Sequence, residues 1–134
     1  MKRFRIGARV DDERLYFEVR LYDTDEEMRA AYRRTTFFLP EQDDDTTCGR
    51  VCPVRNVNGE RSRIGFIFLS RNYCGTRVVS HEMIHAALEF YRSLKGCSAN
   101  FGKRCSPKEE LLADIYEVLF TKMTRKLHAL GVWA

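Results

Sequence analysis

The most restrictive feature of this 134-residue sequence is an apolar stripe near its C-terminal end. Ser106-Pro107-Lys108-Glu109 has the residue types of a helix start, with an N-cap serine, a proline at the first helical position and a capping-box glutamate at the third. Apolar residues then recur at helical spacing for several turns: Leu112, Ile115, Leu119, Met123, Leu127 and Leu130. A helix with one apolar face of this length needs a partner surface, which the rest of the chain must supply.

The N-terminal part is predicted to be mostly extended. Residues 3–10 and 14–22 are expected to be strands, the second because it is rich in β-branched and aromatic residues and partly alternates. Thr24 then begins a short helix, since Thr24-Asp25-Glu26-Glu27 has the form of a capping box. Thr35–Leu39 is expected to be a further brief strand, followed by an acidic loop over residues 41–47.

The central segment predicts a hairpin followed by a helix. Strands near 50–57 and 62–69 are joined by Asn58-Gly59, a dipeptide that favours the positive φ values of a tight turn. A helix from about 76 to 94 comes next. The order β-β-α-β-β-β-α-α predicts a single α+β domain over residues 1–134. In that domain a small, mostly antiparallel sheet packs against the 76–94 helix and a long C-terminal helix.

Composition and charge narrow the class of protein. The sequence is 44% hydrophobic and 31% charged, as in soluble globular domains, and it has no apolar run long enough to span a membrane. Its N-terminal residues are basic but lack the apolar stretch of a signal peptide, so a cytoplasmic protein is expected. The net charge of +4 permits an acidic partner but does not indicate nucleic acid. The oligomeric state is not predicted.

The five cysteines are many for a chain of this length. Their odd number and the missing signal peptide argue against a secreted disulfide framework, so free thiols are expected. An alternative is a structural zinc site formed by Cys48, Cys52, Cys97 and Cys105. The spacing of the last two is loose for such a site.

The chemically informative motif is His81-Glu82-Met83-Ile84-His85. Residues four apart lie on one face of a helix, one turn of about 5.4 Å from each other. Two imidazoles in this arrangement can both reach one Zn²⁺ at about 2.0–2.1 Å. We therefore predict His81 and His85 as zinc ligands, with Glu82 beside them as the general base. The alternative is an exposed helix face that carries two incidental histidines.

A catalytic zinc has three protein ligands and one position open to water. The remaining histidine, His128, lies too far along the last helix to meet the others. Glu109 and Glu110 stand at the start of that helix, and the capping box assigns Glu109 to its own backbone. Glu110 is therefore the expected third ligand, although a glutamate in a first turn is also favoured by the helix dipole. Asp114, one turn later, is expected to accept the second ring N–H of a ligand histidine.

The motif followed by Glu110-Leu111-Leu112-Ala113-Asp114 resembles the gluzincin arrangement of zinc metallopeptidases. The E-x-x-A-D form is most similar to the catalytic core of the CAAX-prenyl-protease type, whose membrane helices this chain lacks. Residues Ile67–Ala87 also resemble small zincin-like proteins of phages and mobile elements. The resemblance covers roughly residues 64–120 and is most specific at the His-Glu-His positions.

The resemblance implies a peptide-bond hydrolase. Zinc would polarise the scissile carbonyl, and its water would attack with Glu82 as base, which then passes the proton to the leaving amine. An extended substrate would pair with the strand before the active helix, here Arg63–Ser70. Gluzincins usually carry a further His or Tyr that stabilises the oxyanion, and Tyr73 is the candidate for that role.

Three functions remain open from the sequence. The first is a zinc-dependent peptidase that acts on a protein or peptide. The second is a zincin-derived module that keeps zinc for stability and regulates a protein partner. The third is a nucleic-acid-associated factor, which the pI of about 8.9 favours although no reader motif is present. An intact Glu82 favours hydrolysis, because a binding module needs no base beside the zinc.

Overall fold

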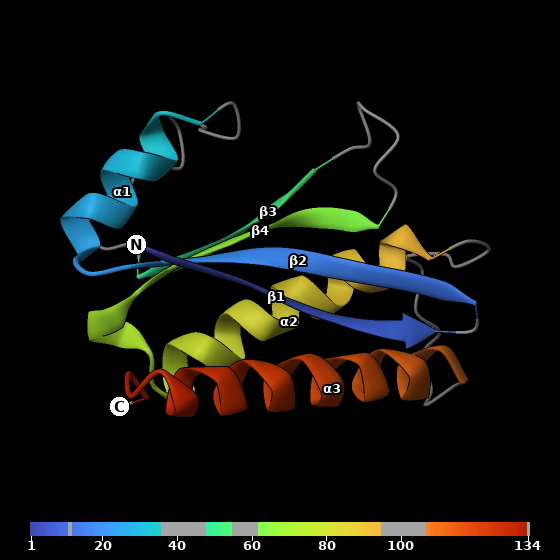
Figure 1. The fold of residues 1–134 in the computed structure, drawn as a ribbon. Coiled ribbons are helices and arrows are strands. Elements are labelled where there is room, and N and C mark those ends of the chain that lie inside the picture. The colour runs from blue at the N-terminus through green and yellow to red at the C-terminus, as the bar shows by residue number, and fades with distance from the viewer. Residues whose placement is uncertain (11, 36–47, 55–61, 95–106, 134) are drawn as a thin grey trace.

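The computed structural model describes residues 1–10, 12–35, 48–54, 62–94 and 107–133. They form four strands, three α-helices and one short 3-10 turn (Figure 1). In chain order these are β1 (Lys2–Val10), β2 (Glu13–Tyr22), α1 (Asp25–Arg33), β3 (Gly49–Pro53), β4 (Arg63–Ser70), η2 (Arg71–Tyr73), α2 (Thr76–Ser93) and α3 (Pro107–Ala129).

The four strands form one mixed sheet in the order β1-β2-β4-β3. The β1–β2 and β3–β4 pairs are antiparallel, whereas β2 and β4 are parallel. The predicted α+β class is confirmed, and antiparallel pairing holds at two of the three interfaces. The central pair is parallel because the chain leaves β2, passes through α1 and β3, and returns to start β4 at the same end. Parallel neighbours need a crossover of this kind rather than a tight turn.

The two faces of the sheet are covered unequally. Figure 1 shows α2 and α3 side by side below the strands, with α1 above them at one end. The main core lies between the sheet and the α2–α3 pair. Alternate residues of β2 enter it, and Phe17 and Val19 are fully excluded from solvent. On α3 the predicted stripe is confirmed by four buried side chains: Ile115, Leu119, Met123 and Leu127. Each contributes about 1.5–3 kcal/mol relative to an exposed position.

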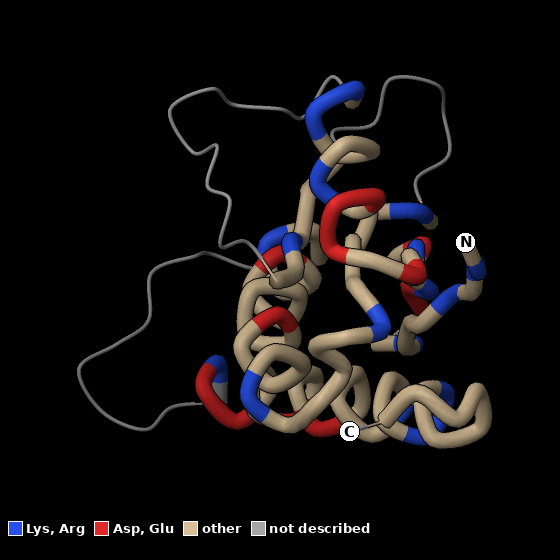
Figure 2. The backbone as a smooth tube through the Cα atoms, turned by 90° about the vertical axis from the view of Figure 1, so that its left-hand side faces the viewer, with Lys and Arg blue, Asp and Glu red and all other residues tan. Residues whose placement is uncertain are grey.

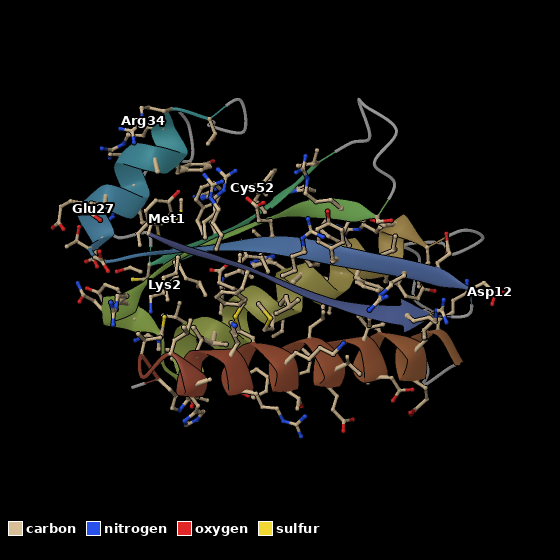
Figure 3. The ribbon with its side chains drawn as sticks, viewed as in Figure 1. Met1, Lys2, Asp12, Glu27, Arg34 and Cys52 are labelled. Carbon is tan, nitrogen blue, oxygen red and sulfur yellow. The ribbon has the colours of Figure 1, made fainter. Side chains whose placement is uncertain are left out.

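Helix α1 closes a second, smaller apolar cluster on the opposite face. Met28 and Tyr32 of α1 pack there against Tyr22, Phe66 and Phe68. The Tyr22 and Phe68 rings are stacked with centroids 6.2 Å apart, and Tyr32 meets Phe68 edge-on at 6.0 Å. Figure 3 shows the same end of the sheet, with Cys52 labelled on the α1 side and Asp12 at the far end of the β1–β2 hairpin. The sheet face beyond α1 carries no helix of the described chain (Figure 1).

Several predicted features fall outside the described residues. They are the strand over Thr35–Leu39 beyond its first residue, the acidic loop, the Asn58-Gly59 turn and the Ser106 N-cap. In the described chain, the other predicted strands and helices are present with boundaries shifted by a few residues, most at the C-terminal end of the strand expected near 50–57. No helix in the described part of the chain is long and apolar enough to cross a membrane.

We predict that Thr24→Ala destabilises the protein by about 1 kcal/mol, because it removes an N-cap. The Thr24 hydroxyl accepts a hydrogen bond from the Glu27 amide at 3.2 Å, as the capping box predicts. Urea unfolding measures the change, and Thr24→Ser is the matched control because it keeps the hydroxyl. An equal loss in both variants would show that the cap does not carry the effect.

Candidate metal centre

The burial of one face of α2 decides where its histidines lie. Val79, Met83 and Phe90 are fully excluded from solvent in the core below the sheet. His81 and His85 lie on another side of the helix, and both are exposed. Since four residues make about one turn, the two rings project side by side. The helix thus presents both imidazoles outside the core, as the motif predicts.

The two rings face each other through the same nitrogen atom. The Nε2 atoms of His81 and His85 are 3.3 Å apart, and the ring planes are inclined at 72°. Two nitrogens bound to a tetrahedral zinc at about 2.0–2.1 Å are separated by about 3.3–3.4 Å. Hydrogen bonds donated by N–H groups are typically shorter, at about 2.9–3.0 Å. The donor pair therefore fits zinc in both element and spacing.

Glu82 leaves the helix in a different direction and is buried against β3. Its side chain is 6% exposed, and its Cγ and Cδ lie over Gly49. A Cβ added to Gly49 would be 3.0 Å from the Glu82 Cγ, so the glycine leaves the space that this carboxylate occupies. Burial raises the pKa of Glu82 to about 7, and Arg50 opposes that shift. The carboxyl group is thus held in a partly desolvated position next to the histidine pair.

Arg50 of β3 lines the pocket beside Glu82 and was not among the site residues predicted from the sequence. Its positive charge lowers the pKa of Glu82, and it also lowers the pKa of His85, after burial and His81 as the larger causes. The Arg50 guanidinium lies 4.6 Å from the centre of the Tyr32 ring. Gly49 and Arg50 were hidden in the sequence because they are far from the motif along the chain. Only strand pairing brings them beside α2.

A pocket of about 650 Å³ opens where α2 meets β3. Its lining includes His81, Glu82, Gly49, Arg50 and Tyr73. A second hollow of about 460 Å³ lies further along the same junction, between the end of β3 and the last turns of α2. The histidine motif therefore borders a concave region that follows the edge of the sheet.

Tyr73, the expected oxyanion donor, lines the same pocket as Glu82. The charge of Asp25 is the largest of the causes that raise the pKa of Tyr73, and its hydroxyl also hydrogen-bonds to that carboxylate. Asp25 in turn accepts hydrogen bonds from the buried Ser70 at 2.8 Å and from Asn72 at 3.0 Å. Tyr73 is thus a neutral hydroxyl whose single hydrogen is donated to Asp25, so it would have to exchange that partner to act as an oxyanion donor.

The structure does not bring the expected third ligand to the histidine pair. Glu110 and Asp114 are both exposed on α3. Figure 1 shows α3 running antiparallel to α2, so the start of α3 lies near the end of α2 rather than near His81. Among the residues that the structure describes, no three His, Cys, Asp or Glu side chains converge as a metal site. The assignment of Glu110, or of Glu109, as the third zinc ligand thus stays a prediction.

The cysteines of the described chain have different environments. Cys52 is buried in the apolar cluster under α1, and Cys74 is buried in the main core, where its thiol donates to the Ser70 carbonyl at 3.2 Å. Cys48 is partly exposed and lines the pocket beside Glu82. Cys97 and Cys105 lie outside the described residues. The expected free thiols are present at the three described positions.

Comparisons with known proteins give no match that bears on this site. No protein-family model matches the sequence, and no match was found among curated proteins or solved structures.

We predict that Cys52 and Cys74 react very slowly with iodoacetamide in the folded protein, whereas Cys48 reacts readily. Burial raises the pKa of Cys52 to about 12 and that of Cys74 to about 11. Only the thiolate is alkylated, so their rates should keep rising about tenfold per pH unit up to about pH 10. A rate that levels off near pH 9 would instead indicate an ordinary thiol of pKa about 8.5, exposed by local opening. Peptide mass spectrometry resolves each position.

Proposed function

We propose that this protein is a zinc-dependent peptidase in which His81 and His85 hold the metal and Glu82 is the general base. The observation that carries the proposal is the 3.3 Å separation of the two Nε2 atoms, which matches a tetrahedral zinc. Zinc, when bound, activates water near neutral pH and polarises a carbonyl group. The remaining steps fall to side chains of this chain.

Glu82 is placed to move protons beside the histidine pair. It lines the pocket next to His81, and its burial excludes most water from the carboxyl group. As a base it would take a proton from the attacking water and then give it to the leaving amine. Tyr73 lines the same pocket, and its hydroxyl could donate to a developing oxyanion once it turns away from Asp25.

The strand that pairs with substrate is β3 rather than β4, which corrects the expectation for Arg63–Ser70. β4 has neighbours on both sides, so its backbone groups are already paired. In the described chain β3 is an edge strand. The Val54 amide donates inward to Ile64, so by alternation the amides of Gly49 and Val51 point outward.

This free edge is short and lies beside the proposed base. Gly49 is in contact with Glu82, and Pro53 has no amide to offer at the other end. An extended peptide added at Gly49 and Val51 would place its backbone next to the pocket that holds His81 and Glu82. The geometry thus favours a peptide or an unfolded protein segment as substrate.

We predict about one zinc per chain in the wild-type protein and its loss in both His81→Ala and His85→Ala. Elemental mass spectrometry after removal of loose metal measures the content, and Co²⁺ substitution reports the tetrahedral geometry by visible absorption. Glu82→Gln should keep the metal but lose about 10²–10⁴ of the hydrolysis of a denatured-protein peptide mixture.

The same series tests the third ligand. Loss of zinc in Glu110→Ala would support that residue, whereas retention would assign the position to another donor of the chain. Wild-type protein that takes up no zinc even when zinc is added would overturn the proposal. Zinc binding without any hydrolysis would leave the regulatory binding module as the function.

We further predict that Gly49→Ala lowers kcat about tenfold and leaves the zinc content unchanged. The new methyl group would push the Glu82 side chain, and Leu69 beside it, aside by a few tenths of an ångström, since its Cβ would be 3.0 Å from the Glu82 Cγ and 3.1 Å from the Leu69 Cδ2. The double variant with Glu82→Gln is the control, because Gly49→Ala should have no further effect once the base is gone. An additive loss in the double variant would show that Gly49 acts through something other than Glu82.

A further inference from the structure

The sheet face opposite α2 and α3 is rich in arginine. In β1, Phe4, Ile6, Ala8 and Val10 pack into or against the core. The residues between them, Arg3, Arg5, Gly7 and Arg9, therefore face away from it. Figure 2 shows basic positions recurring along the chain from the N-terminus. Arg14 and Arg20 continue this face on β2. Helix α1 covers only the other end of the face (Figure 1).

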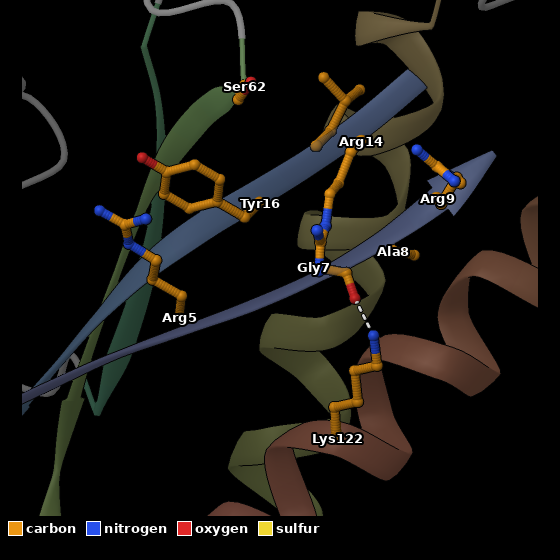
Figure 4. Close-up of a pocket in the computed structure, with 9 residues that line it drawn as sticks. Arg5, Gly7, Ala8, Arg9, Arg14, Tyr16, Ser62 and Lys122 are labelled. Atoms are coloured by element: carbon orange, nitrogen blue, oxygen red, sulfur yellow. Dashed lines mark hydrogen bonds between the residues drawn. The ribbon is translucent and has the colours of Figure 1, made fainter. Parts of the chain in front are cut away.

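Part of this face forms a pocket of about 860 Å³. Its lining includes Arg5, Arg9, Arg14 and Lys122, and all four side chains are exposed. None of the nine described residues that line it is acidic. In Figure 4 the cationic side chains surround Gly7, with Lys122 reaching in from α3. Four positive charges around one concavity create a local potential that attracts anions.

The register of the hairpin places like charges directly opposite each other at two positions and opposite charges, Arg5 and Glu18, at a third. Arg9 is the cross-strand partner of Arg14, and Arg3 is the partner of Arg20. Like charges at such positions destabilise a sheet. Glu18 offsets Arg20 through an ion pair of 2.9 Å. For Arg9 and Arg14, which both line the pocket, an anion bound between the two guanidinium groups would relieve the repulsion.

Two contacts hold cations of this pocket in place. The Arg5 guanidinium lies 4.5 Å from the centre of the Tyr16 ring, so a cation–π contact holds it beside the aromatic face. The Lys122 ammonium donates a hydrogen bond to the Gly7 carbonyl, which fixes it at the edge of β1 (Figure 4). Gly7 has no side chain between Arg5 and Arg9, and a Cβ there would be 2.2 Å from the Leu15 carbonyl. Glycine is therefore required at this position by the close approach of the β2 backbone.

We propose that this arginine-lined pocket binds the phosphate backbone of a single-stranded nucleic acid. The charges are spread along two strands rather than focused on one point, which fits a chain of phosphates better than one small anion. The Arg5 guanidinium beside Tyr16 offers a planar cationic group on which an unpaired base can stack. The pocket lies along β1 and β2, at the opposite edge of the sheet from β3, and shares no lining residue with the pocket at His81 and Glu82, so the proposal does not depend on the zinc site.

The test is fluorescence anisotropy with a labelled oligo-dT of about 12 nucleotides, a length that covers one small binding site. Binding should weaken steeply from about 50 mM to about 200 mM salt, because each neutralised phosphate contributes about −0.7 to the slope of log K against log salt. We expect Arg9→Gln/Arg14→Gln to weaken binding about tenfold or more at low salt and to flatten the slope by about 1.4.

The matched control is Arg71→Gln/Arg125→Gln, which removes the same charge from exposed positions elsewhere and should leave binding unchanged. Relief of the cross-strand repulsion should leave the melting temperature of Arg9→Gln/Arg14→Gln unchanged or higher, so its loss of binding is not a loss of fold. Equal weakening in the control, absence of binding by the wild type, tighter binding of duplex DNA, or preference for phosphatidylserine vesicles would each overturn the proposal.

Discussion

The packing of α2 against the sheet and α3 is the contact on which the rest of the site depends. Val79, Met83 and Phe90 are fully buried, and this fixes the rotation of the helix about its own axis. That rotation leaves His81 and His85 outside the core and turns Glu82 toward β3. A helix rotated by one residue, about 100°, would either bury His85 together with Glu82 or turn Glu82 out toward solvent. The roles proposed for His81, Glu82 and His85 therefore depend on the burial of apolar residues on another face of α2. They also depend on Gly49, which has no side chain to occupy the position of Glu82.

The sequence predicted local features well and pairings poorly. The Thr24 cap, the α3 stripe and the facing histidines were all predicted, because each depends on residues within one or two turns. The parallel β2–β4 pair and the interior place of β4 were not, since periodicity does not specify which strands become neighbours. Gly49 and Arg50 were missed for the same reason, as they join the site only through strand pairing. The third zinc ligand depends on the relative placement of two helices, which no local pattern encodes.

The positions of the charged residues in the fold, like the strand pairing, do not follow from the composition. A net charge of +4 is modest, and the sequence alone gave no reason to expect a nucleic acid. Strand alternation and hairpin register then gather arginines of β1 and β2 on one face and set Arg9 against Arg14. Acidic residues are numerous but lie largely elsewhere, among them the first turn of α1. The two proposed sites lie at opposite edges of one sheet and share no lining residue, so a ligand at one need not exclude a ligand at the other.

The single proline of β3 has a consequence for how copies of this protein meet in solution. An edge strand that accepts a peptide is equally open to a strand of another molecule, and long flat edges of this kind seed aggregation. Pro53 carries no hydrogen where the next outward amide would stand, so the pairing edge ends after Gly49 and Val51. Two or three residues of pairing are too few to hold two sheets together unaided. Among the residues that the structure describes, this edge can therefore remain unpaired in a concentrated solution and still accept a flexible segment that also binds in the neighbouring pocket.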